Sequence, residues 1–86
     1  VYAAIDYFQQ ALSVCPRNGA IHHRLAACFH EAGLLEDAHR HYRLALAVLP
    51  YSLTLLCDYA ENALVLAFYE ECRAVLAQAQ MYYPHA

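Results

Sequence analysis

The chain has 86 residues, of which 62% are hydrophobic, with only two glycines and three prolines. This length holds one domain at most, and the composition excludes a disordered or fibrous chain. Eight acidic residues against five arginines and no lysine give a formal charge of −3, which argues against a nucleic-acid partner because phosphate contacts need clustered cations.

The sequence predicts neither a membrane-spanning segment nor a signal peptide. No apolar run reaches the roughly 18 uninterrupted residues that a membrane span needs, and "LALAVLPYSLTLLC" is interrupted by Pro50 and Ser52. The first residues carry no basic segment or cleavage motif, so no signal peptide is predicted. Because Val1 stands where an initiator methionine would, we expect a piece of a longer chain or a processed one.

Residues 1–18 predict one helix, since Ala4, Phe8 and Ala11 follow a helical spacing and Pro16 comes after them. A second helix is expected from about Ala20 to Ala32. Asn18 is suited to cap its start, and Gly33 can adopt the left-handed conformation that ends a helix. Its predicted core positions share one helical face: Ile21, Leu25, Cys28, Phe29 and Ala32.

A third helix is predicted up to Pro50, with Glu36 and Asp37 near its positive end. Its positions of interest are Ala38, Tyr42, Ala45, Leu46 and Val48. Two further helices follow in residues 53–86. Ser52 is placed to cap the first of them, and Glu70 and Glu71 repeat the acidic start in the second.

The chain repeats itself at a fixed interval. The step from Pro16 to Pro50 equals the step from Pro50 to Pro84, and the same shift places small residues on small ones and bulky residues on bulky ones. The superposed sets are Ala4, Ala38 and Cys72; Phe8, Tyr42 and Leu76; Ala11, Ala45 and Ala79; Leu25-Ala26 and Tyr59-Ala60; Gly33 and Ala67. A simple helical bundle has no reason to show this period.

These residues resemble the tetratricopeptide repeat family, whose unit of about 34 residues matches the interval between the prolines. The motif is read in His22-x-x-Leu25-Ala26-x-x-Phe29, Ala38-x-x-x-Tyr42 and Pro50, with His22 where tryptophan or leucine is usual. The resemblance covers almost the whole chain as a partial repeat in 1–18, a complete repeat in 19–52 and a more divergent one in 53–86. It implies an all-α fold of about five helices wound as a right-handed α-solenoid.

The cysteines and histidines are the residues that could bind a metal. Cys15, Cys28, Cys57 and Cys72 form no C-x-x-C pair, and we interpret them as buried thiols of a reducing compartment, which predicts a cytoplasmic protein. A zinc site built across helices from His23 or His30 with Cys57 is the alternative.

The spacing of the histidines does not favour a metal site on one helix. His22 and His23 point about 100° apart on a helix, His39 and His41 point to nearly opposite sides, and no i, i+4 pair occurs. We expect His22 in the core and the other histidines on the surface.

Neither a phosphate-binding loop nor a nucleophile motif is present, so we predict no enzyme activity, no catalytic residue and no cofactor. In tetratricopeptide proteins the outer faces of the first helices line a concave groove that holds a partner peptide. Carried over to this chain, the resemblance implies a protein-interaction scaffold with these partner-binding residues: His23, Arg24, Ala27, His30, Glu31, Cys57, Asp58, Glu61, Leu64 and Val65.

The character of this groove is expected to be mixed, with a mild apolar floor at Ala27 and Leu64. A surface ion pair between Arg24 and Asp58 is the simplest use of those two charges. Without lysines, and with Ala27 at an expected asparagine position, the clamp that some relatives use for a chaperone's C-terminal carboxylate is not expected. Two other functions stay open: a purely structural segment of a longer solenoid, and a chaperone with the same repeat. Self-association through the apolar terminal helices is also expected.

Overall fold

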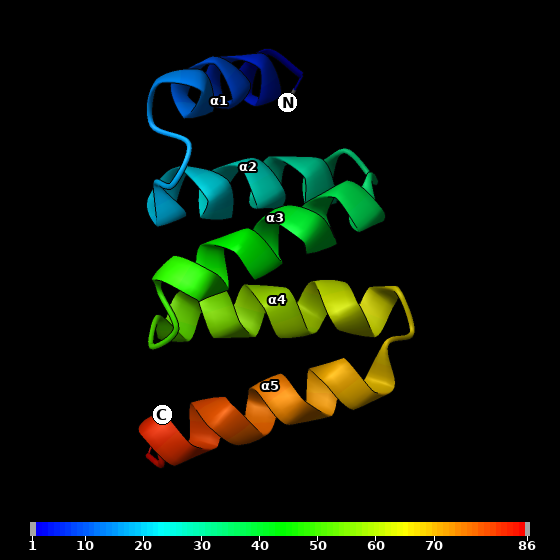
Figure 1. Ribbon diagram of the computed structural model, residues 1–86. Coiled ribbons are helices and arrows are strands. Elements are labelled where there is room, and N and C mark those ends of the chain that lie inside the picture. Colours follow the sequence, from blue (N-terminus) through cyan, green and yellow to red (C-terminus); the bar gives the residue numbers. More distant parts are fainter. Residues whose placement is uncertain (1, 86) are drawn as a thin grey trace.

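The structure is a computed structural model that describes residues 2–85. It contains five α-helices and, within these residues, no strand: α1 (Tyr2–Val14), α2 (Gly19–Glu31), α3 (Leu35–Val48), α4 (Leu53–Val65) and α5 (Tyr69–Tyr82). The helices stack in chain order from α1 to α5, as Figure 1 shows, and each packs on its neighbours in sequence. The predicted all-helical class is confirmed.

Capping side chains mark the starts of α2 and α4. The side-chain oxygen of Asn18 accepts from the backbone N–H of Ile21 at 3.0 Å, and Ser52 accepts from that of Leu55 at 3.3 Å. Both predicted caps are confirmed. The predicted acidic starts also lie in the first turns, with Glu36 and Asp37 in α3 and Glu70 and Glu71 in α5.

The turns after α2 and α4 have the same backbone form. Gly33 has φ +80°, and Ala67, its equivalent one repeat later, has φ +64°. In both turns the backbone N–H of the next residue bonds back to a carbonyl of the preceding helix, Leu34 to Phe29 and Phe68 to Ala63, at 2.8 Å each. The left-handed conformation expected at Gly33 is confirmed, and Ala67 adopts it despite its Cβ.

The helix bounds recur with the period of the sequence. The starts of α2 and α4, and those of α3 and α5, are separated by the same interval as the prolines, and so are the successive ends of α1, α3 and α5. The α2 helix begins and ends one residue before the predicted bounds. Residues 19–48 and 53–82 are thus two copies of one helical hairpin, and α1 corresponds to its second helix.

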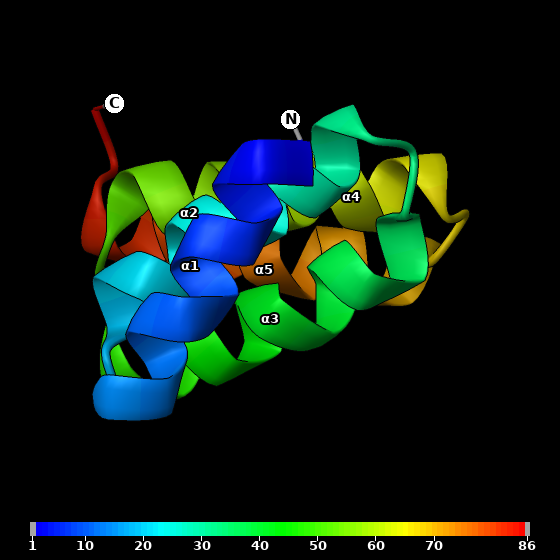
Figure 2. The same ribbon diagram turned by 90° about the horizontal axis from the view of Figure 1, so that it is seen from above.

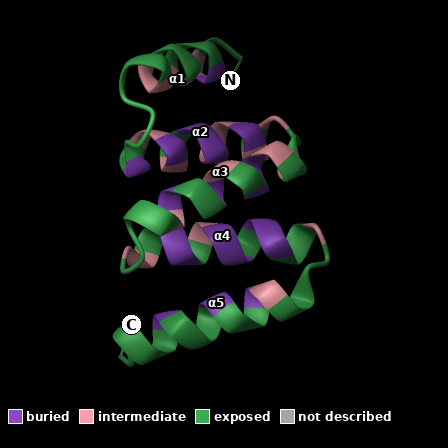
Figure 3. Cartoon of the chain, viewed as in Figure 1, coloured by how far each residue is buried: buried purple, intermediate pink, exposed green. Residues whose placement is uncertain are grey.

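The core lies between facing helices, where the purple residues of Figure 3 are found, and α1 and α5 are mostly exposed. Ala26, Ala38, Ala45 and Ala60 are buried as their spacing suggested, and small buried residues allow packed helices to approach closely. His22 is buried at its predicted core position. Val48, by contrast, is exposed near the end of α3.

The prediction of four buried cysteines is wrong. Only Cys72 is buried; Cys28 is partly buried, and Cys15 and Cys57 are exposed. Cys15 follows the end of α1 and Cys57 lies on the outer side of α4, where an apolar neighbourhood in sequence does not produce burial. All four are free thiols.

Across residues 2–85, no helix is both long and apolar enough to span a bilayer.

Candidate partner-binding face between α2 and α4

The ten predicted partner-binding residues lie on the two first helices of the hairpins. We call this set the α2/α4 face: His23, Arg24, Ala27, His30 and Glu31 on α2, and Cys57, Asp58, Glu61, Leu64 and Val65 on α4. The two helices contact each other directly, and Figure 2, which looks along the stack, shows α4 behind α2 with α3 set to one side. The repeat places equivalent turns of the two helices next to each other.

Asp58 pairs with His23 and not with Arg24. His23 Nε2 lies 2.7 Å from Asp58 Oδ2, so this nitrogen carries a proton and donates to the carboxylate. The predicted pair between Arg24 and Asp58 is therefore wrong. Arg24 follows His23 in α2, and successive helical residues point about 100° apart. The Arg24 side chain is exposed.

A buried asparagine orients His30. The Asn62 side chain is fully buried, and its amide nitrogen donates to the Leu35 carbonyl at 3.0 Å. Its oxygen therefore faces His30 Nδ1, at 2.7 Å, which must be the protonated ring nitrogen. His30 Nε2 is then turned toward Glu61, 3.8 Å away.

Five of the predicted residues line one small cavity of about 140 Å³: Ala27, His30, Glu31, Asp58 and Glu61. The sixth lining residue is Tyr42 of α3, which the sequence analysis placed in the core. Its ring is buried as predicted, but the side chain also reaches this cavity. Burial, followed by the Asp58 and Glu61 carboxylates, raises the pKa of the Tyr42 hydroxyl, so it stays protonated.

The other five predicted residues of the α2/α4 face do not line that cavity. His23 bonds to Asp58 beside it. Arg24, Cys57, Leu64 and Val65 are all exposed, Leu64 and Val65 to more than half of their surface. They extend the α2/α4 face on both sides of the cavity with one cation, a thiol and two aliphatic side chains.

Of the five histidines that were expected on the surface, His85 is exposed and the other four are not. His39 is buried, and His23, His30 and His41 are partly buried. His22 Nδ1 and His41 Nδ1 lie 3.0 Å apart, in rings that stack at 25°. The pair joins α2 to α3, and the spacing of histidines within one helix does not predict it.

The hydrogen bond of His22 to the Pro16 carbonyl fixes which ring nitrogens of His22 and His41 carry a proton. His22 Nε2 lies 2.9 Å from the Pro16 carbonyl oxygen and must donate to it. In the neutral ring His22 Nδ1 is then an acceptor, so His41 Nδ1 donates. Burial, with His22 and then Arg40 as further causes, lowers the pKa of His41 to about 4.

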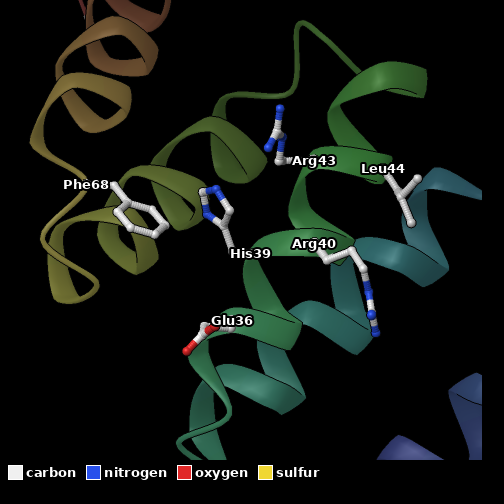
Figure 4. Close-up of a pocket in the computed structure, with 6 residues that line it drawn as sticks. All are labelled: Glu36, His39, Arg40, Arg43, Leu44 and Phe68. Atoms are coloured by element: carbon white, nitrogen blue, oxygen red, sulfur yellow. The ribbon is translucent and has the colours of Figure 1, made fainter.

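A second and larger concavity, of about 490 Å³, lies along α3. Its lining is shown in Figure 4: Glu36, His39, Arg40, Arg43, Leu44 and Phe68. His39 Nε2 donates to Glu71 at 2.8 Å, and Tyr59 donates to the same oxygen at 3.3 Å. His39 Nδ1 is buried without a hydrogen-bond partner. We call the concavity that these six residues line the α3 cavity.

The described residues contain no group of three or more histidine, cysteine or acidic side chains placed to hold a metal ion. His23 and His30 are instead hydrogen-bonded to Asp58 and Asn62. Their ring nitrogens orient α4 side chains across the α2/α4 face.

Neither comparison of the sequence with models of known families nor comparison with curated proteins returns a match. The function of the chain is therefore inferred from its sequence repeat, the α2/α4 face and the α3 cavity.

Proposed function

We propose that the chain is part of a tetratricopeptide-type α-solenoid, and that it binds an extended segment of a partner protein along the α2/α4 face. Two copies of one hairpin, offset by the interval that separates the prolines, support the solenoid. In this architecture each repeat contacts only its neighbours, and the first helices of successive repeats line one continuous surface.

The observation that carries the binding function is the open cavity on that surface. Its side chains come from both α2 and α4, and their polar groups are oriented by hydrogen bonds between the helices. A merely structural segment would not need polar side chains held in place around an open space. Ala27 and Leu64 add apolar area, and Arg24 adds a cation, so a partner segment of mixed charge is favoured.

Peptide selection tests this function. A random library of extended peptides of about 12 residues is suitable, because such a peptide spans about 40 Å and the longest dimension of the protein is 36 Å. Selected peptides are then measured by calorimetry against the unchanged protein, Arg24→Glu and Arg40→Glu. Both arginines are exposed, so neither change should affect folding.

We expect Arg24→Glu to weaken binding by about fivefold and Arg40→Glu to leave it unchanged, since Arg40 lies on α3. If the selected peptides respond to Arg40→Glu and ignore Arg24→Glu, they bind at the α3 cavity and the proposed face is wrong.

A further inference from the structure

The small cavity of the α2/α4 face is surrounded by hydrogen-bond acceptors. Glu31, Asp58 and Glu61 line it, and no arginine does. Asp58 uses Oδ2 to accept from His23, and its Oδ1 makes no hydrogen bond to another described residue. Glu61 is 69% exposed at its side chain, so its carboxylate is free to turn toward a ligand.

Tyr42 is a second and independent indication that the cavity binds a ligand. The residue is only 3% exposed, it lines the cavity, and its hydroxyl makes no hydrogen bond within residues 2–85. The hydroxyl opens onto the cavity, where a donor of a ligand can bond to it in place of water. The hydroxyl oxygen can accept from a donor placed in the cavity.

The imidazole N–H groups that donate beside the cavity are already used, and the Tyr42 O–H is a lining donor with no hydrogen bond within residues 2–85. His23 Nε2 donates to Asp58, and His30 Nδ1 donates to Asn62. A ligand that satisfies this cavity must therefore bring several N–H donors and a positive charge.

The volume of about 140 Å³ corresponds to roughly four or five water molecules at liquid density. This space accommodates a guanidinium group with the methylene next to it. Arginine presents five N–H donors in a planar fork, whereas the compact lysine ammonium has three and would leave acceptors unpaired.

We propose that this cavity receives an arginine side chain of the partner segment, with Asp58 and Glu61 balancing its charge and Tyr42 accepting one of its hydrogen bonds. This inference rests on the proposed function of the α2/α4 face, and it names the partner residue which that face selects.

The test uses a short probe peptide, acetyl-Gly-Arg-Gly-amide, titrated into the labelled full chain and followed by two-dimensional NMR. Acetyl-Gly-citrulline-Gly-amide is the matched neutral probe, because citrulline keeps the shape and loses the charge. We expect saturable shifts at Ala27, His30 and Glu61, with a dissociation constant on the order of millimolar. Binding of the citrulline probe should be at least about fivefold weaker.

Three variants locate the site. Glu61→Gln should weaken the arginine probe about two- to fivefold, and Glu36→Gln, the same change on α3, should have no effect. Tyr42→Phe should also weaken the probe while leaving the thermal midpoint unchanged or raised, because the unliganded hydroxyl has no partner to lose.

The proposal is overturned if the two probes bind equally, if the shifts centre on α3, or if no saturable shift occurs. Library peptides that bind the α2/α4 face without enrichment of arginine would also overturn it, and they would leave the proposed function intact. Library peptides that bind only at the α3 cavity would instead remove the proposed function.

Discussion

Ala67 and His41 each lower the stability of the fold in a way that the residues at the equivalent positions of the other repeats do not. Ala67 has φ +64° in a turn where the earlier repeat has Gly33. His41 donates from a partly buried ring to another histidine. Each has an effect on stability that can be measured.

Replacing Ala67 by glycine should stabilise the protein. A residue with a Cβ in the left-handed conformation costs about 1–2 kcal/mol of stability. Glycine removes this cost, but it also raises the conformational entropy of the unfolded chain, which offsets part of the gain. We expect a net gain of about 0.5–1 kcal/mol, measured as a higher urea midpoint with an unchanged slope. The matched change Gly33→Ala should lower the midpoint. A loss of stability in Ala67→Gly would contradict the conformation of this turn.

Acid should weaken the fold through His41. Its pKa is about 4 in the folded protein and 6.5 in the reference state, so between these values the unfolded chain binds more protons. The contribution of His41 to the free energy of unfolding is therefore fully present above pH 6.5 and is lost as the pH falls to about 4. Because the ring is only partly buried, we expect about 1–2 kcal/mol.

The measurement is the free energy of unfolding at about pH 7 and about pH 4 for the unchanged protein and for His41→Asn. The asparagine amide can replace the donating Nδ1 but does not titrate. His22, Arg40 and Asp37 are the other charged or titratable groups near His41, and they are the same in both proteins. An equal loss in both proteins would show that His41 is not responsible.

At the scale of helices, close approach depends on small residues. Ala38 has no exposed surface, and the repeat register predicts that it lies where α3 packs on α2. Ala38→Leu would force extra atoms into that contact and should cost about 1–3 kcal/mol in thermal unfolding. The control is Ala74→Leu, an exposed position of α5, which should have little effect. If Ala38→Leu were neutral, the pairing of α2 with α3 would be wrong.

Sequence reasoning succeeded for features that depend on local pattern. The caps Asn18 and Ser52, the turn at Gly33 and the buried alanines each follow from nearby residues or from the repeat spacing. It failed where side chains meet across helices. The pair of His22 with His41 and that of His23 with Asp58 depend on rotamers and helix packing, which no spacing in one helix predicts.

The sequence pattern did not predict that the Tyr42 side chain lines the small cavity, for a similar reason. Its position in the repeat predicts burial, which is correct for the ring. The only signal for a second role was the hydroxyl itself, because phenylalanine would fill the same space without a polar group that needs a partner.

At the scale of the whole molecule, the terminal helices present uncovered apolar side chains. Tyr2, Tyr7 and Val14 of α1 are exposed, as is Met81 of α5. In a stacked repeat such faces are normally covered by another helix, so we expect this chain to self-associate through them.

Sedimentation velocity tests this expectation over a range of concentrations. The unchanged protein should show an average mass that rises with concentration, and the double substitution Tyr7→Glu with Met81→Glu should reduce that rise. A monomer at every concentration would show that the exposed faces of α1 and α5 do not drive association.

The central claim, that a partner lies along the α2/α4 face, is tested most directly by thiol labelling of the unchanged protein. Cys57 is exposed on that face, and Cys15 is also exposed, after the end of α1, so it is an internal control. With a saturating library-selected peptide, labelling of Cys57 should slow by an order of magnitude or more while that of Cys15 stays the same. Unchanged labelling of Cys57 under saturation would contradict the claim.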